Sequence, residues 1–481
     1  MDDQDVTEIV HEGRITRRRM LFGTAGAIGA AAFLAACGDD DDSGSSATTA
    51  AASATTAAGS TATTAGGTET TGGGGSETTS GGGGGGGGGD LVSLLEIDEA
   101  SAGKGKTVEL AAVLALTGTG SFYGKTMGRG LDLAAKHIAE LGGPTFKYTY
   151  LDHKSGDAAA GVQAMAEIVS KKIPAKFASY TDDLGAMLSS TAENKVFTLD
   201  GGGGTSIFGQ GKPYFWGTRA ITPNDPLPGL FKWTKETYPD AKTVGLIGWD
   251  IGEPNNSIVK EDLLKKIKDG GYEHNGLYEL VPVGGQDFSQ VLPKIKSNEP
   301  DILLVVNYGQ DPGSFANQAA TAGLKAVRVG FEFTPDGLNA SKGTYDSDGL
   351  TFAYDYFDPK NPKSPLAKKF VEDFNADNGE DPDFYAANFY ENAFVMWQLM
   401  RRIWAKDPEA AITGDSLDKA LQEDLTVVSV YGGDDSTIGT YTLDPKTHSV
   451  LKREMGVFEY KGGKVTPKAF FGIDGADYKK A

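Results

Sequence analysis

Strand-like and helix-like patterns alternate along the sequence from residue 107 to residue 331. Val108–Leu116 is a continuous apolar run, which is typical of a strand buried on both faces, and a helix pattern follows it to Glu140. The same alternation starts again at Asp225. Strands separated by helices in this way predict parallel sheets that are covered by helices on both faces. We therefore expect an α/β fold made of two similar lobes.

The remaining elements are expected at the spacing of βαβ units. The expected strands are 146–151, 176–179, 196–199, 243–249, 277–282, 301–306 and 328–331. The expected helices are 121–140, 155–171, 184 onward, 225–238, 257–269, 289–297 and 312–322. Ser155-Gly156-Asp157 is a helix-start signal, because an aspartate there can accept from the first free backbone N–H groups.

Polar segments follow these strands where they end. Lobes of this type bind ligands beyond the carboxyl ends of their strands, so these segments are the candidate site. They are 118–123, 180–183, 201–204, 250–256, Tyr308 and Glu332. The glycines Gly201, Gly202 and Gly203 offer free backbone N–H groups to a carboxylate or phosphate oxygen. No helix start or P-loop lysine follows them, which argues against a nucleotide loop.

The sequence contains little catalytic chemistry. Its five histidines are scattered without metal-ligand spacing, and we expect His137 and His274 to be solvated surface residues. No G-x-S-x-G or H-E-x-x-H motif is present, and adjacent acids such as Asp182 and Asp183 are usually turn formers or caps. We expect a protein that is not an enzyme and that has no metal and no cofactor. Trp216, Trp233 and Trp249 are expected in the core.

The N-terminal region predicts an export signal. A basic patch at Arg17–Arg19 precedes an apolar run from Leu21 to Ala36, which is shorter than the ~20 residues of a membrane-spanning helix. Leu34-Ala35-Ala36-Cys37 resembles a bacterial lipobox, which implies that residues 1–36 are removed and that Cys37 is lipidated at the extracytoplasmic face of the cell membrane. The arginines resemble a twin-arginine signal and also suit the general secretory route. The alternative is a signal with an incidental cysteine.

A low-complexity segment follows Cys37. From Gly38 to Asp90 it contains no large apolar side chain and ends in a glycine run, so nothing offsets its ordering entropy. We expect residues 37–106 to be a disordered tether. Cys37 is the only cysteine, so the folded part has no disulfide and no thiolate metal site. The chain carries a net charge of −20, which argues against a nucleic-acid partner.

Several short motifs of the folded part follow one another in a recognisable order. They are Phe122-Tyr123-Gly124, Gly130-Leu131-Asp132-Leu133-Ala134, Lys212-Pro213-Tyr214-Phe215-Trp216, Gln286-Asp287-Phe288-Ser289 and Gln318-Ala319-Ala320-Thr321-Ala322-Gly323-Leu324-Lys325. With this order and spacing the chain from Thr107 to about Phe458 resembles the leucine/isoleucine/valine-binding family, the type I substrate-binding proteins of ABC transporters.

The resemblance implies a type I periplasmic-binding fold with two Rossmann-like lobes around a cleft, formed by residues 107–221 plus 351–445 and by residues 222–350 plus 446–481. Three crossing segments would join the lobes, which close like a hinge on a small ligand. The closed monomer would be presented to an ABC permease in the membrane. The alternative within the same fold is a ligand-sensing receptor without a transport role.

The resemblance also implies roles for individual site residues. Glu332 falls where the family pairs an acid with a ligand ammonium group, and Tyr123 and Tyr308 fall where it places aromatic walls. A structural cap or an ion pair between the lobes is the alternative role for Glu332. Asp182 and Asp183 stand where the family presents serine hydroxyls to a ligand carboxylate, and an acid there would repel it. We therefore expect an aliphatic amino acid, an amide, urea or polyamine-like cation, or another small ligand.

Overall fold

The computed structural model describes residues 87–179, 181–203, 205–220, 223–432 and 439–481. These residues belong to one unit of the chain, residues 80–481. The export signal of residues 1–36, Cys37 and the tether up to residue 86 lie outside the described residues. Within the described part no helix combines the length and the apolar character that crossing a bilayer requires.

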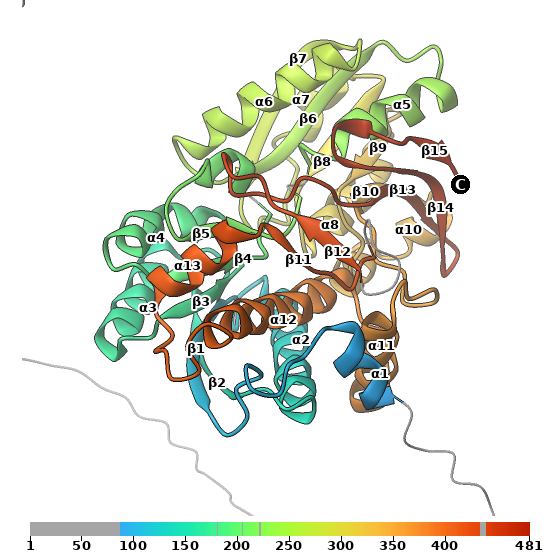
Figure 1. Cartoon of the computed structure of the whole chain (residues 1–481). Helices are drawn as coiled ribbons and strands as arrows, with labels where there is room; N and C mark the ends of the chain where they lie inside the picture. Colours follow the sequence, from blue (N-terminus) through green and yellow to red (C-terminus); the bar gives the residue numbers. More distant parts are fainter. Residues whose placement is uncertain (1–86, 180, 204, 221–222, 433–438) are drawn as a thin grey trace, which may run out of the picture. The chain divides into compact units, whose positions relative to one another are not determined.

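The first sheet has five parallel strands in the order β2-β1-β3-β4-β5 (Figure 1). The strands are β1 (Thr107–Leu114), β2 (Thr145–Asp152), β3 (Ala175–Ala178), β4 (Phe197–Asp200) and β5 (Phe215–Gly217). The connecting helices are α2 (Ser121–Glu140), α3 (Ala158–Lys171) and α4 (Thr181–Glu193). As expected from the sequence, Asp157 caps α3 by accepting from two backbone N–H groups of its first turn.

The first sheet is covered on both faces, which confirms the prediction that its strand β1 is buried on both sides. Leu110 and Leu114 face the cluster that α2 helps to form, whereas Ala111 and Val113 face α3 and α4. Side chains of a strand alternate between faces, so a strand with helices on both sides needs an unbroken apolar run.

The second sheet has eight strands in the order β15-β14-β13-β10-β9-β8-β6-β7. The parallel strands are β6 (Thr243–Asp250), β7 (Glu273–Pro282), β8 (Ile302–Val306), β9 (Val327–Gly330) and β10 (Leu350–Asp355). The antiparallel strands are β13 (Met455–Lys461), β14 (Lys464–Phe471) and β15 (Lys479–Lys480). The helices are α5 (Leu227–Thr237), α6 (Asn255–Asp269), α7 (Leu292–Ser297), α8 (Asp311–Ala322), α9 (Pro335–Ala340) and α10 (Thr344–Ser347).

Strand β10 changes one expected boundary. It pairs with β9 and with β13, so residues 350–355 belong to the eight-stranded sheet and not to the first lobe. The chain crosses to the first lobe after Asp355, a few residues later than the sequence led us to expect. The remaining elements of this region are α11 (Pro365–Asn378), α12 (Phe384–Trp404), α13 (Gly414–Glu423), β11 (Thr426–Val428) and β12 (Thr440–Thr442).

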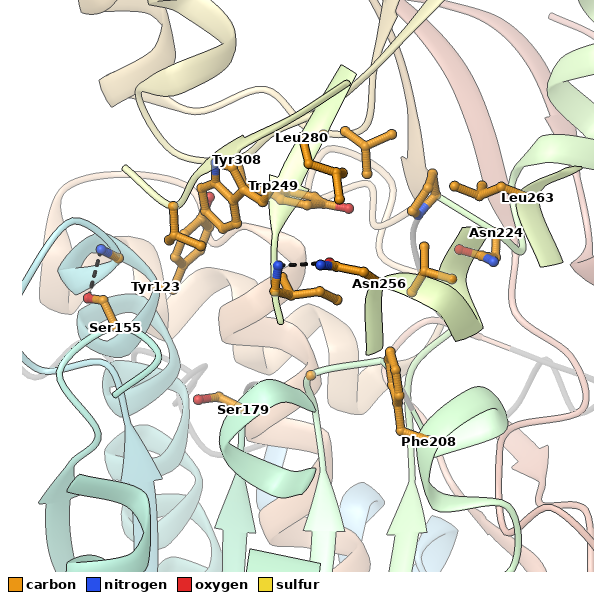
Figure 2. A pocket seen from close by; sticks show the side chains of 18 of the residues that line it. Tyr123, Ser155, Ser179, Phe208, Asn224, Trp249, Asn256, Leu263, Leu280 and Tyr308 are labelled. Atoms are coloured by element: carbon orange, nitrogen blue, oxygen red, sulfur yellow. Dashed lines mark hydrogen bonds between the residues drawn. The ribbon is translucent and has the colours of Figure 1, made fainter. Parts of the chain in front are cut away.

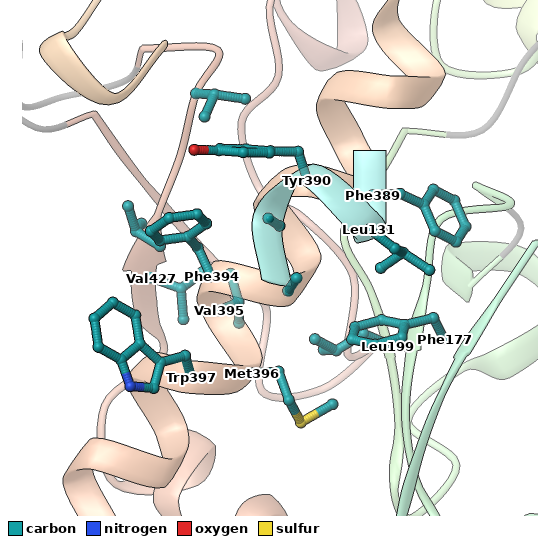
Figure 3. Packing of buried hydrophobic residues seen from close by; sticks show 14 of the residues in the cluster. Leu131, Phe177, Leu199, Phe389, Tyr390, Phe394, Val395, Met396, Trp397 and Val427 are labelled. Carbon is teal, nitrogen blue, oxygen red and sulfur yellow. The ribbon is translucent and has the colours of Figure 1, made fainter. Parts of the chain in front are cut away.

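Helix α12 is the centre of the first lobe's core. It packs against α2, and Gly130 makes the close approach, because a Cβ atom there would lie 2.3 Å from the carbonyl oxygen of Ala386. Figure 3 shows Phe394 and Trp397 of α12 in the same cluster as Leu131 of α2 and Phe177 of β3. A helix with buried residues around its whole circumference needs partners on every side, and α12 has them.

Residues 91–106 are folded, which corrects the expectation of a tether up to residue 106. They begin with the second half of helix α1 (Gly87–Leu94), and Leu91, Leu95 and Ala102 are buried in the first core. The indole N–H of Trp397 donates to the Ala102 carbonyl oxygen at 2.8 Å.

His137 is also placed differently from expectation, because it is buried between α2 and its neighbours. Its Nδ1 lies 2.7 Å from the Tyr390 hydroxyl, and its Nε2 lies 2.9 Å from an Asp373 carboxylate oxygen. Burial lowers the pKa of His137 to about 4.

Candidate functional site

A cavity of about 180 Å³ lies where strands of both sheets end (Figure 2). Thr119, Ser155, Ser179 and Gly202 reach it from the loops after β1 to β4. The second sheet contributes residues from the strand-end segments after β6, β7 and β8 and from the strands themselves. The lining residues are Thr119, Gly120, Tyr123, Met127, Ser155, Ser179, Gly202, Phe208, Arg219, Pro223, Asn224, Leu246, Gly248, Trp249, Ile251, Asn256, Val259, Leu263, Tyr278, Leu280, Val283, Val306, Tyr308 and Tyr385.

Tyr123 and Glu332 join the two lobes beside this cavity. The Tyr123 hydroxyl lies 2.7 Å from each carboxylate oxygen of Glu332, and the Tyr385 hydroxyl lies 3.3 Å from Oε2. The backbone N–H of Gly309 donates to Oε1. Glu332 is 3% exposed, and Tyr123, but not Glu332, is among the lining residues that the structure describes. The contact joins the lobes, as the alternative role for Glu332 anticipated, but by hydrogen bonds and not by an ion pair.

The burial of Glu332 has an electrostatic consequence. Burial raises the pKa of its carboxyl group to about 7, although the hydrogen bonds from Tyr123 and Gly309 favour the charged form. Glu332 therefore exchanges its proton near neutral pH. An acid whose oxygens already accept from protein donors has less to offer a ligand ammonium group.

Tyr308 and Trp249 form one aromatic wall. Their ring centroids are 5.3 Å apart in an edge-to-face arrangement. The Trp249 indole N–H donates to Asp311 Oδ2 at 2.7 Å, and burial raises the pKa of Asp311 to about 6. Trp216 and Trp233 are in the cores as expected, but Trp249 is half-buried and lines the cavity. The position of Trp249 at the end of a strand, directly before Asp250, was a signal that could have identified it.

The glycine segment is placed at the cavity, but its N–H groups are partly occupied. Gly202 lines the cavity, and its N–H donates to Asp200 Oδ1 at 2.7 Å. The N–H of Gly201 donates to the Ala178 carbonyl oxygen at 2.9 Å. The expectation of free N–H groups is therefore wrong for these two residues. Gly203 has a φ of 91°, which favours glycine.

Asp182 and Asp183 lie in the first turn of α4. Their side chains lie outside the described residues, so the predicted contact of these two acids with a ligand stays a prediction.

Arg219 is a cavity residue that sequence reasoning missed. It lies in the first crossing segment, after β5, and it is the only charged side chain among the described residues that line the cavity. Its Nε donates to Asp355 Oδ2 at 3.0 Å, and its guanidinium carbon lies 4.8 Å from the ring centroid of Phe384. Arg219 follows the carboxyl end of β5 by two residues, but β5 is only three residues long and was not among the expected strands, so the strand-end rule was not applied there.

A second buried pair stands at the other crossings. Arg453 contacts Glu391 at 3.0 Å and donates to the carbonyl oxygen of Thr218. Burial raises the pKa of both Glu391 and Asp355, and the two arginines oppose that change. Asp355, Arg453 and Arg219 thus bring one charge from each crossing segment into one buried region.

One serine–histidine contact near the cavity resembles the pair that activates a serine nucleophile. His153 Nε2 lies 2.9 Å from the Ser179 hydroxyl, and Ser179 lines the cavity. The backbone N–H of Gly156 donates to His153 Nδ1 at 3.2 Å, which makes Nδ1 the acceptor and places the ring proton on Nε2. Nε2 then donates to the serine and cannot accept its proton, so the pair does not form an activated nucleophile. Among the described residues no group of three His, Cys, Asp or Glu side chains could hold a metal ion.

A two-lobed α/β protein with a cavity at facing strand ends defines a class of ligand-binding proteins. The sequence profile of the family described as periplasmic binding protein matches residues 107–464. The chain therefore belongs to this family and has its type I fold.

Individual relatives are distant in sequence. The Leu/Ile/Val-binding protein homolog 2 of Brucella abortus is 22% identical over 336 residues, which cover 68% of this chain and 87% of that protein. A leucine-binding protein of Thermotoga maritima shares the fold with a TM-score of 0.62 at 20% identity, covering 76% of this chain and 98% of that one. An ABC transporter solute-binding protein of R. palustris in complex with benzoate gives 0.63 at 19% identity, with coverage of 78% and 98%.

Proposed function

We propose that this protein is the extracytoplasmic solute-binding component of an ABC importer. It captures a small organic solute in the cavity by closure of the two lobes and delivers it to the permease as a monomer. The observation that carries this proposal is the cavity itself, whose wall is built from strand ends of both sheets. The Tyr123–Glu332 contact fits such a closure, because one partner follows β1 and the other follows β9.

The proposed protein binds its solute without converting it and uses no cofactor. The tautomer of His153 supports this, because it removes the serine–histidine pair that the described residues place at the cavity from nucleophilic catalysis. The distant relatives that carry leucine-binding and benzoate-bound descriptions are also solute-binding proteins.

The proposed location is the outer face of the cell membrane. Residues 1–36 act as the export signal, and Cys37 carries the lipid after the signal is removed. Replacement of Cys37 by serine should abolish incorporation of radiolabelled palmitate and release the protein from the membrane fraction. Normal lipid labelling of the Cys37→Ser protein would contradict the anchor.

The family resemblance and the contacts of Glu332 favour different ligands. The resemblance to amino-acid receptors favours an ammonium group at Glu332, but in the structure Glu332 accepts from Tyr123, Tyr385 and Gly309. The benzoate complex of the R. palustris protein is an example of this fold holding a carboxylate that has no ammonium group.

Solute uptake by cells tests the proposed function. A strain that lacks the gene should lose high-affinity uptake of a radiolabelled solute that the purified protein binds, and the intact gene should restore uptake. Unchanged uptake together with a lost transcriptional response to that solute would contradict transport and would indicate a sensor.

A further inference from the structure

The cavity extends from the strand ends into the second lobe. Leu280, Gly248 and Val306 are register partners on β7, β6 and β8, so they point to the same side of the sheet. All three line the cavity. The residue in the middle of this row is a glycine, which has no side chain to fill the layer above the sheet.

The next row and the covering helix complete an apolar chamber. Leu246 and Tyr278 are also register partners, and both line the cavity. Val259 and Leu263 line it from α6, one turn apart on the same helix face. In the view of Figure 2, Leu263 lies on the side of the cavity away from Ser155.

Gly248 leaves usable space in this chamber. A Cβ atom built on Gly248 would meet its nearest neighbours at 3.4 Å, namely Leu246 and Val306. A methyl group therefore fits there at about van der Waals contact, and a larger side chain would extend into the chamber. The chamber is a space that this sequence keeps open by the absence of one side chain.

The cavity wall carries a guanidinium group that can hydrogen-bond a carboxylate, although Asp355 already balances its charge. Arg219 is the one charged lining side chain among the residues that the structure describes, and Asp355 is bonded to its Nε. A guanidinium group has five N–H donors, so Arg219 can donate from its terminal nitrogens to a second carboxylate. Glu332, the acid expected to meet an ammonium group, accepts hydrogen bonds from Tyr123 and Gly309 and is not among the described residues that line the cavity.

We propose that the solute is an amphipathic monocarboxylate without an ammonium group. Its aryl or alkyl body occupies the chamber between α6 and the row Leu280–Gly248–Val306, and its carboxylate faces Arg219. This assignment rests on the proposed solute-binding function and names its ligand class.

Matched ligands test the two ends of the solute separately. Isothermal titration of the full-length protein in detergent compares 3-phenylpropionate with phenylalanine, which adds only the α-ammonium group, and with 3-phenylpropionamide, which removes the charge. We expect saturable binding of 3-phenylpropionate. Phenylalanine should bind about a hundredfold more weakly or worse, because the described lining side chains include no carboxylate to pair with its ammonium group. The amide should bind about tenfold more weakly or worse.

Two variants test the chamber from opposite sides. Gly248→Leu fills it from the sheet, and Val259→Phe fills it from α6, where Val259 is half-buried and its surroundings can adjust. Each variant should lower the affinity for 3-phenylpropionate at least thirtyfold, whereas the affinity of the control Gly248→Ala should stay within about fivefold of the wild-type value. The melting temperature of each variant shows whether it folds. If Gly248→Leu does not fold, Val259→Phe still decides whether the chamber holds the solute.

The outcomes separate the ligand class from the function. Binding of phenylalanine or leucine as tightly as 3-phenylpropionate, or full affinity in both folded chamber variants, would overturn the assignment and leave solute binding intact. Absence of binding by every carboxylate tested would also overturn it. Solute import itself is decided by the uptake experiment with whichever solute binds.

Discussion

Replacing Glu332 by glutamine removes a buried carboxyl group that titrates near neutral pH. The unfolded chain releases this proton near pH 4.5, whereas the folded protein holds it up to about pH 7. Between these values the folded state binds more protons than the unfolded state, so the contribution of Glu332 to the free energy of unfolding falls as the pH rises. Glutamine keeps the shape of the side chain and has no titrating proton.

The magnitude follows from the two pKa values. A shift from 4.5 to about 7 corresponds to about 3.4 kcal/mol in full, of which about 2.5 kcal/mol is lost between pH 5 and pH 8. The Glu332→Gln protein should therefore gain stability relative to wild type by about 2.5 kcal/mol over this range.

Urea unfolding at pH 5, 6, 7 and 8 measures this difference, and the comparison of two proteins cancels the other titrating groups. Glu193→Gln, on the exposed end of α4, is the matched control and should follow the wild-type profile. If the Glu332→Gln profile ran parallel to that of the wild type, the account of Glu332 as a buried acid held by Tyr123 and Gly309 would be refuted.

Three further predictions concern the cavity wall, a buried lysine and the N-terminal segment. Trp249→Phe removes a 2.7 Å bond to Asp311 and should lower the free energy of unfolding at pH 8 by about 1–3 kcal/mol in urea titrations. Burial lowers the pKa of Lys176 from 10.5 to about 7, so wild-type stability should rise with pH between these values and Lys176→Met should flatten that rise; a Lys176→Met profile as steep as wild type would be the contrary result. A chain that begins at Thr107 should be about 3–6 kcal/mol less stable than one that begins at Gly87, because it lacks two buried leucines; equal urea midpoints would contradict this.

The sequence predicted the two-lobed fold because local periodicity carries that information. The unbroken apolar run of β1 identified a strand covered on both faces, and Asp157 marked a helix start. The strand-end rule then led to Tyr123, Gly202 and Tyr308, all of which the structure brings to one cavity. These inferences depend on neighbours within a few turns or on a general property of parallel sheets.

The missed features depend on contacts between distant segments. Arg219 lies in a crossing segment, and its pairing with Asp355 joins residues 136 positions apart. Residues 91–106 have a weak pattern of their own and are held by Trp397 and its neighbours. In the sequence, Gly248 is one more residue of a predicted buried strand. Only the strand register, which places it between Leu280 and Val306, shows that its missing side chain leaves space for the chamber.

The position of a bound solute tests the central claim most directly. Crystals of the protein grown with 3-(4-bromophenyl)propionate allow the bromine atom to be located by its anomalous scattering. The account predicts a single peak in the chamber between α6 and Gly248, with density for the carboxylate toward Arg219. A bromine peak elsewhere on the protein, with the chamber empty, would contradict it.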